Sequence, residues 1–109
     1  MATPDRKHFY AAADKALRHI DEVLGSLELD ELDVQLAGDV LTLAFAGGSK
    51  FVINAHSAAG QIWMAAGTDA WHFDLDETSG RWIASKNGDE LMATVAARVG
   101  ARLGRSLAL

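Results

Sequence analysis

Carboxylates crowd one stretch of this chain. Between residues 21 and 39 there is neither Lys nor Arg, and the acids there are Asp21, Glu22, Glu28, Asp30, Glu31, Asp33 and Asp39. Hard cations such as Fe²⁺, Fe³⁺, Mn²⁺ and Ca²⁺ prefer carboxylate oxygen, and crowded like charges favour cation binding. Because the acids follow no fixed ligand spacing, the stretch predicts weak, exposed binding, with water completing the coordination.

A solvated charged face is the alternative interpretation of this stretch, because charge runs often serve solubility alone. The whole chain has 15 acids against 10 Lys and Arg, which gives a net charge of −5. This balance disfavours nucleic-acid backbones and favours cationic partners. We therefore expect a basic protein surface as partner, and no nucleic acid.

The chain has no cysteine, which excludes disulfides, thiolate nucleophiles and Cys-ligated metal sites. Any metal must therefore be held by oxygen or imidazole. No pair of its four histidines has the i, i+4 spacing of a helical metal site, and only His8 is kept as a weak ligand candidate. The apolar runs are too short for a membrane span or a secretory signal, so we expect a cytoplasmic protein without a membrane partner.

Two amphipathic helices flank the centre of the chain. Apolar residues recur every three or four positions across residues 5–25, from Phe9 to Leu24, which predicts one helix with a single apolar stripe. A second helix is predicted to begin at residues 87–89, with acids at its positive end. Gly100 and Gly104 are expected to weaken its last turns.

Between the helices the apolar period changes to two, which is typical of half-buried strands. Strands are predicted at residues 32–36, 40–45, 50–54, 61–65, 71–75 and 81–84. Short turns rich in Gly and Asp separate them, as in an antiparallel meander. The 109 residues therefore predict one α+β domain, residues 1–109: a two-layer sandwich with two helices on one face of a six-stranded antiparallel sheet and solvent on the other.

Trp63 is the candidate interface residue of this sheet. If Ile62 and Met64 face the core, alternation places Trp63 on the opposite face. An exposed Trp is a common interface anchor, and Asn54 and Gln61 would flank it as polar partners. The alternative is a second apolar face shielded by a loop. The alternation leaves open whether His72 faces the core or the solvent.

Three segments carry a family resemblance. Residues 48–54 (GSKFVIN), 61–65 (QIWMA) and 71–75 (WHFDL) resemble the signature of the frataxin family. The acidic first helix and first strand are similar too, as is the closing Trp82 followed by residues 87–90 (NGDE). The resemblance covers about residues 9–103.

The resemblance implies a monomeric, iron-binding accessory protein of iron–sulfur cluster assembly and not an enzyme, although weak ferroxidase activity is compatible with it. Such proteins bind Fe²⁺ or Fe³⁺ weakly on an acidic ridge, and iron-dependent oligomers are compatible with the family. They also bind the cysteine desulfurase and the iron–sulfur scaffold protein, and they regulate cluster formation as iron sensors or iron donors.

The resemblance also implies a set of site residues. The acidic ridge, as the term is used below, comprises the acids of the first helix and first strand: Asp14, Asp21, Glu22, Glu28, Asp30, Glu31 and Asp33. His8 is a further metal-ligand candidate. The implied partner-binding residues are Asn54, Gln61, Trp63, Glu22 and Asp30. Two alternatives remain: an enzyme that oxidises iron on the same carboxylates, and a plain acidic protein-interaction domain.

Overall fold

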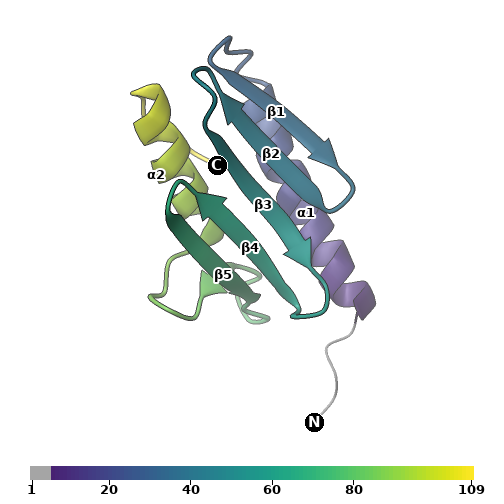
Figure 1. The fold of residues 1–109 in the computed structure, drawn as a ribbon. Helices are drawn as coiled ribbons and strands as arrows, with labels where there is room; N and C mark the ends of the chain where they lie inside the picture. The colour runs from purple at the N-terminus through teal and green to yellow at the C-terminus, as the bar shows by residue number, and fades with distance from the viewer. Residues whose placement is uncertain (1–5) are drawn as a thin grey trace.

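The computed structural model describes residues 6–109 (Figure 1). Along the chain the elements are α1 (Arg6–Gly25), β1 (Leu32–Ala37), β2 (Val40–Phe45), β3 (Lys50–His56), β4 (Gln61–Ala66), β5 (Asp69–Leu75), β6 (Trp82–Ala84) and α2 (Leu91–Leu103). The predicted first residue of the first helix, Asp5, lies outside the described residues. The order of one helix, six strands and one helix is the order that the periodicity predicts.

The six strands form one antiparallel sheet in chain order, β1-β2-β3-β4-β5-β6. The turn between β1 and β2 contains Gly38 with a φ of 57°, a conformation that glycine adopts without strain. Four strands are longer than predicted, and β6 is one residue shorter. β1 and β4 each gain one residue at the end, and the larger changes are in β3 and β5. β3 continues to His56, which pairs with Gln61, and β5 begins at Asp69, which pairs with Ala66. The extension of β3 brings His56 onto the sheet, two residues beyond the predicted end of this strand.

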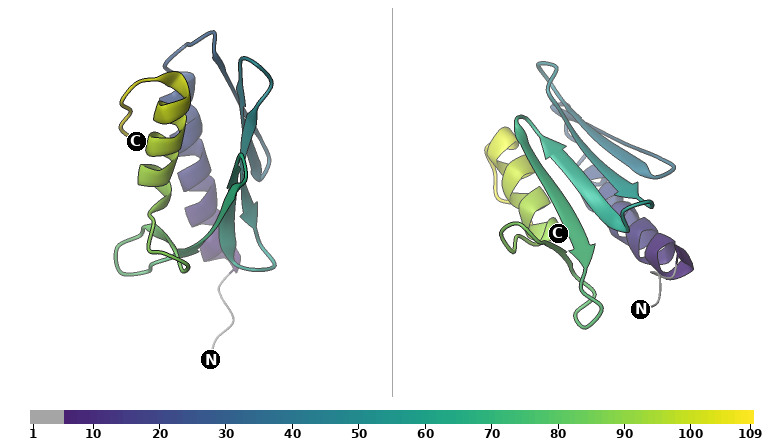
Figure 2. Two further views of the ribbon diagram at one scale, coloured as in Figure 1. Left: turned by 60° about the vertical axis from the view of Figure 1, so that its left-hand side comes forward. Right: turned by 60° about the horizontal axis from the view of Figure 1, so that its bottom comes forward.

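Both helices cover the same face of the sheet and leave the other face open (Figure 2). Leu17 and Ile20 of α1, Ile53 and Phe73 of the sheet, and Val95 of α2 are almost completely buried between the layers. This arrangement confirms the predicted two-layer α+β sandwich. Among residues 6–109, no helix has the length and apolarity needed to cross a membrane.

The start of α2 differs from the prediction by a few residues. Asn87 forms a turn in which its side-chain oxygen accepts a hydrogen bond from the Asp89 amide at 3.0 Å. Glu90 is the N-cap residue, and its carboxylate accepts hydrogen bonds from the amides of Met92 and Ala93 at 2.8 and 3.0 Å. The helix therefore begins at Leu91, because the Glu90 carboxylate caps amides of its first turn that have no acceptor within the helix.

Gly100 has a packing role that the sequence did not reveal. A Cβ atom at this position would lie 2.5 Å from the carbonyl oxygen of Arg105, so only glycine allows the chain to fold back here. Gly104 ends the helix in the left-handed conformation, with a φ of 70°. The residues that follow return to the core, where Leu107 packs against it. The expectation that Gly100 weakens the helix is therefore incomplete, because its missing side chain is what lets this turn form.

Candidate functional site

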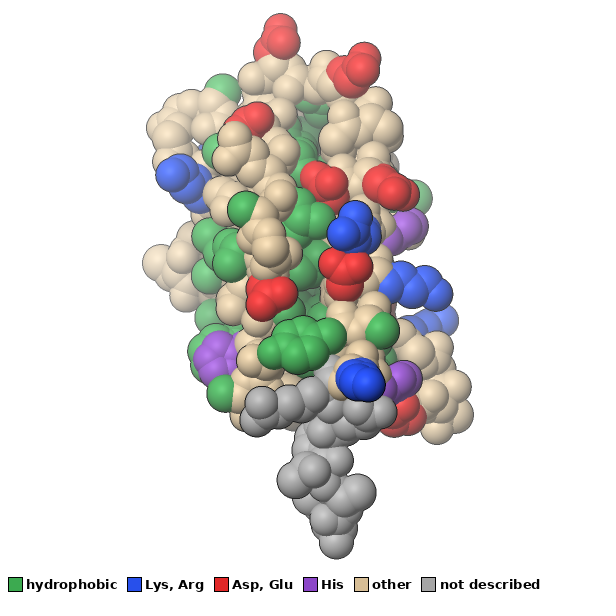
Figure 3. All heavy atoms as spheres, turned by 90° about the vertical axis from the view of Figure 1, so that its right-hand side faces the viewer, with side chains coloured by type: hydrophobic (Ala, Val, Ile, Leu, Met, Phe, Trp, Pro, Cys, Tyr) green, Lys and Arg blue, Asp and Glu red, His purple; other side chains and the backbone are tan. Residues whose placement is uncertain are grey.

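The acidic ridge follows one edge of the molecule. α1 packs against β1, which pairs only with β2 and so forms the edge of the sheet. Figure 3 shows acidic side chains spread over α1 and β1 on this side, with apolar side chains in the seam between them. Glu28 has a φ of 51° and turns the chain between the two elements. Six of the seven ridge residues are exposed and Asp21 is half-buried, so all seven are open to solvent.

Most ridge carboxylates form no ion pair with another described residue. Asp14 is the exception, because its Oδ2 atom accepts a hydrogen bond from Arg18 Nε at 2.8 Å. Within residues 6–109, no ion pair involves any of the other six. No ion pair among the described residues therefore neutralises these six charges, and together they favour a negative potential along this edge.

The carboxylates at the other end of the chain are all engaged. Asp69 pairs with Arg98 at 2.8 Å, Asp76 accepts from the Ser79 hydroxyl at 2.7 Å, and the Glu90 carboxylate caps α2. Asp74 accepts a hydrogen bond from Gln61, and Asp89 accepts one from Trp71. Glu77 pairs with His8. The same side-chain type thus builds structure between residues 69 and 90, whereas most ridge carboxylates form no ion pair within the described part of the chain.

The ridge does not form a closed metal site. No group of three or more His, Asp or Glu side chains in the described part of the chain is arranged to hold a metal ion. The ridge can instead offer single carboxylates and neighbouring pairs, such as Asp30 and Glu31, to a cation that keeps much of its water. Weak, exposed cation binding on the ridge stays a prediction from the irregular spacing of the acids.

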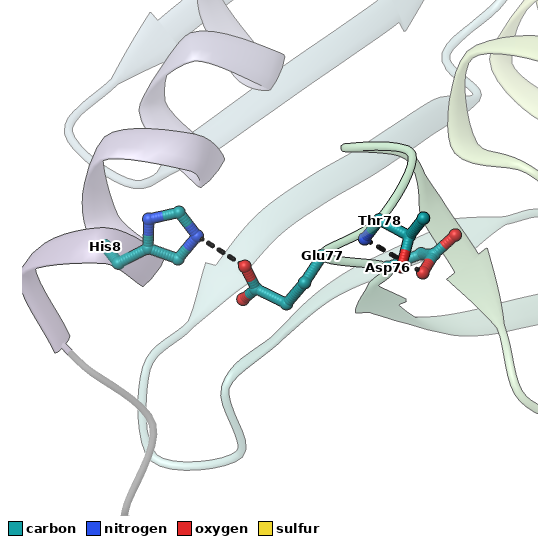
Figure 4. A network of polar contacts seen from close by, with 4 residues as sticks. All are labelled: His8, Asp76, Glu77 and Thr78. Atoms are coloured by element: carbon teal, nitrogen blue, oxygen red, sulfur yellow. Dashed lines mark hydrogen bonds and ion pairs between the residues drawn. The ribbon is translucent and has the colours of Figure 1, made fainter.

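His8 lies apart from most of the ridge. Its Nε2 atom is 2.9 Å from Glu77 Oε2, which belongs to the loop between β5 and β6 (Figure 4). The helical rise places it about 20 Å along α1 from Glu22. His8 therefore joins α1 to this loop.

In the same loop, the Ser79 hydroxyl lowers the pKa of Asp76 by donating a hydrogen bond to it, and the amide of Thr78 adds a second one.

Trp63 lies on the open face of the sheet, as the alternation predicts. Its neighbours Ile62 and Met64 are buried, with 0% and 2% of their surface exposed. Across the strands Trp63 is level with Asn54 on one side and His72 on the other. Its indole Nε1 donates to Gln61 Oε1 at 2.8 Å, so Gln61 does flank it as a polar neighbour.

Two imidazole rings cover the indole of Trp63. The His56 ring lies 3.7 Å from it between centroids with an interplanar angle of 12°, and the His72 ring lies 4.4 Å away at 14°. Trp63 is consequently half-buried and not fully open to solvent. The sequence did not indicate this stack, because the predicted third strand ends at Asn54 and leaves His56 outside the sheet. The alternation of Val52 and Asn54, continued by one step, would have placed His56 on the face of Trp63.

Comparison with known proteins identifies relatives of the whole domain. The chain matches the family model described as a frataxin-like domain over residues 2–105. It is 37% identical over 106 residues to the iron–sulfur cluster assembly protein CyaY of Dechloromonas aromatica (strain RCB), covering 96% of this chain and 98% of that protein. It is 32% identical to the protein of the same name from Azotobacter vinelandii, covering 76% and 74% of the two chains.

Solved structures agree with this match. Frataxin from Psychromonas ingrahamii superimposes with a TM-score of 0.86 at 25% identity, covering 95% of this chain and 96% of that one. A trimeric frataxin from the yeast Saccharomyces cerevisiae, in complex with ferrous iron, gives a TM-score of 0.75 at 29% identity, covering 86% and 87%. These matches confirm the resemblance drawn from the strand motifs, and the chain belongs to the frataxin-like family.

Proposed function

We propose that this protein is a non-enzymatic accessory protein of iron–sulfur cluster assembly that binds iron weakly on the acidic ridge and binds the cysteine desulfurase. The names of its two bacterial relatives support a role in that assembly. In this proposal the protein acts as a cytoplasmic monomer and regulates cluster formation, as an iron sensor or an iron donor.

The observation that carries the proposal is the free charge of the ridge. Six exposed or half-buried carboxylates share one edge without an ion pair among the described residues, whereas the carboxylates between residues 69 and 90 all have partners. Like charges held together repel one another, and a bound cation or basic surface relieves that repulsion. The fold holds them together because α1 and β1 pack side by side.

Iron is the cation that we assign to the ridge. The yeast neighbour, which shares this fold, was solved in complex with ferrous iron. Carboxylate oxygens suit Fe²⁺ and Fe³⁺, and the absence of a three-ligand cluster within residues 6–109 fits weak binding. Bound iron would cancel part of the negative potential and thereby change the affinity for a basic partner, which couples iron level to regulation.

The partner surface combines the ridge with the open face of the sheet. Glu22 and Asp30 would meet Lys and Arg side chains of the desulfurase, while Asn54, Gln61 and Trp63 would contact the desulfurase or the iron–sulfur scaffold protein. An interface steered by exposed charges weakens when salt screens them. We therefore expect the desulfurase affinity to fall as ionic strength rises.

Calorimetry with the purified cysteine desulfurase of the same organism tests the partner. The variant D21N/E22Q removes two ridge charges, and D69N/E77Q removes two charges from the paired carboxylates between residues 69 and 90. Because each exposed charge pair contributes about 0.2–1 kcal/mol, we expect the loss of two pairs in D21N/E22Q to lower the affinity by about twofold to thirtyfold. An equal loss in the control variant, or an affinity that does not change from low to high salt, would contradict the proposal.

Metal titration distinguishes this proposal from its two alternatives. Under anaerobic conditions, added Fe²⁺ should broaden NMR signals of residues 14–33 and leave those of α2 sharp. The absence of localised broadening would favour a plain acidic interaction domain. Catalytic turnover of Fe²⁺ with oxygen, lost when ridge carboxylates are replaced by Ala, would favour an iron-oxidising enzyme.

A further inference from the structure

The stack of His56, Trp63 and His72 lies on the open face of the sheet, and the fold alone does not require it. The three rings come from β3, β4 and β5, and both faces of the indole are covered by imidazole. The two covering residues differ: His72 is exposed, whereas His56 is half-buried and its Nδ1 atom has no hydrogen-bond partner among the described residues. The indole nitrogen is held in place by Gln61.

We propose that His56 and His72 form a proton-sensitive cover over Trp63 that regulates binding of the assembly partners to this face. The identity of those partners rests on the proposed function above. Histidine is the side chain that changes charge between pH 5 and 8. A protonated imidazole is attracted to the face of an indole ring, so protonation tightens the cover on Trp63.

The charged groups around the stack determine how much protonation of His56 and His72 changes the charge of this face. Asp74 lies on the same face of β5, and its carboxylate accepts from Gln61 at 2.9 Å. Asp39, in the turn between β1 and β2, accepts a backbone hydrogen bond from Ala55 beside His56. The open-face residues of β2, β4 and β6 carry no charge, and Lys50 lies at the far end of β3. Two bound protons would therefore more than offset the negative charge of Asp74, which shares the open face of β5 with His72.

Both consequences of protonation weaken partner binding. A partner that stacks on the indole must displace one imidazole, and the exposed His72 is the ring that can move. Displacing a charged imidazole gives up a cation–π contact that the neutral ring does not have. A basic partner is also repelled by the added positive charge. Affinity at this face is therefore highest when both imidazoles are neutral.

The cover can be tested in the protein alone by NMR between pH 8 and pH 5. The indole Nε1–H signal of Trp63, assigned by its loss in W63F, should shift with the same midpoints as the imidazole signals of His56 and His72. The shift should disappear in H56Q/H72Q and persist in H19Q, which removes a histidine from α1. An indole signal that stays constant while both imidazoles titrate would overturn the proposal.

The consequence for binding is tested with the preformed complex of desulfurase and scaffold protein. Because these partners also titrate, the measured quantity is the ratio of dissociation constants at pH 6.0 and pH 7.5, compared among wild type, H56Q/H72Q and H19Q. We expect the ratio to be about threefold to tenfold larger for wild type and H19Q than for H56Q/H72Q. Equal ratios would overturn the regulatory role. If wild type binds at neither pH, the proposed function fails, and the indole titration alone decides whether the cover exists.

Discussion

The acidic ridge and the region from β5 to α2 use carboxylates in opposite ways. At the ridge, six carboxylates form no ion pair within the described residues. From β5 to α2, each carboxylate accepts a hydrogen bond or forms an ion pair: two hold Arg98 and His8, two bind side chains of the sheet, one organises a loop and one caps a helix. Both regions are acidic in sequence, so acidity alone does not separate structure from function.

The difference predicts which acids contribute to stability. A carboxylate that satisfies a buried donor or a helix end leaves that group unpaired when it is removed, and the folded state loses free energy. A carboxylate that only adds to a crowd of like charges costs little to remove. Substitutions at the two ends of the chain should therefore change the free energy of unfolding very differently.

The largest effect is expected at Asp89. Its Oδ2 atom accepts from the indole nitrogen of Trp71 at 3.0 Å, and Trp71 is buried. Asp89→Ala should lower the free energy of unfolding by about 1–2 kcal/mol, because the indole donor loses its acceptor. Urea unfolding followed by circular dichroism measures this change. Asp30→Ala on the ridge is the matched control and should leave the midpoint nearly unchanged; similar losses in both variants would erase the distinction between the two regions.

A somewhat smaller effect is expected at the start of α2. Glu90→Ala removes the acceptor of two backbone hydrogen bonds and should cost about 1 kcal/mol. Glu22→Ala replaces an exposed residue inside α1 by a better helix former and should have no cost. Thermal unfolding of the two variants at low salt gives the comparison directly. A ridge variant that melts earlier than Glu90→Ala would show that the ridge, too, serves the fold.

The smallest effect concerns the pH dependence of Asp76. The Ser79 hydroxyl lowers the pKa of this carboxyl, so its contribution to stability is present above about pH 4 and is lost as the pH falls through the lowered value. Ser79→Ala removes the hydrogen bond and should move the pKa of Asp76 upward toward its ordinary value. Carbon-detected NMR of the carboxyl groups during an acid titration measures the pKa of Asp76 in both proteins. An unchanged titration of Asp76 would mean that the backbone amides of the turn suffice.

Periodicity and turn residues were enough to predict the order of the elements and the layer arrangement. They fixed strand ends less well, because pairing in the folded sheet extends β3 to His56 and β5 to Asp69. The role of Gly100 depends on a carbonyl group that returns only after the helix has ended. Local patterns do not contain such contacts.

The candidate site, too, could be predicted from the sequence only in part. The density of ridge charge could be read from the acids between residues 21 and 39, but their lack of ion pairs required coordinates. The face of Trp63 followed from alternation with Ile62 and Met64. Its stack could not be predicted, since it depends on the register of three strands and on rotamers that turn two imidazoles toward one indole.

The position of β1 at the end of the sheet has one more consequence. Its outer row of backbone amides and carbonyls faces away from β2, and an open row of this kind can recruit a strand from another molecule. Charged side chains on such a strand oppose that contact. We therefore expect Asp33 and the neighbouring ridge carboxylates to oppose the joining of sheets between copies of the protein, and we expect this opposition to weaken when their charge is compensated.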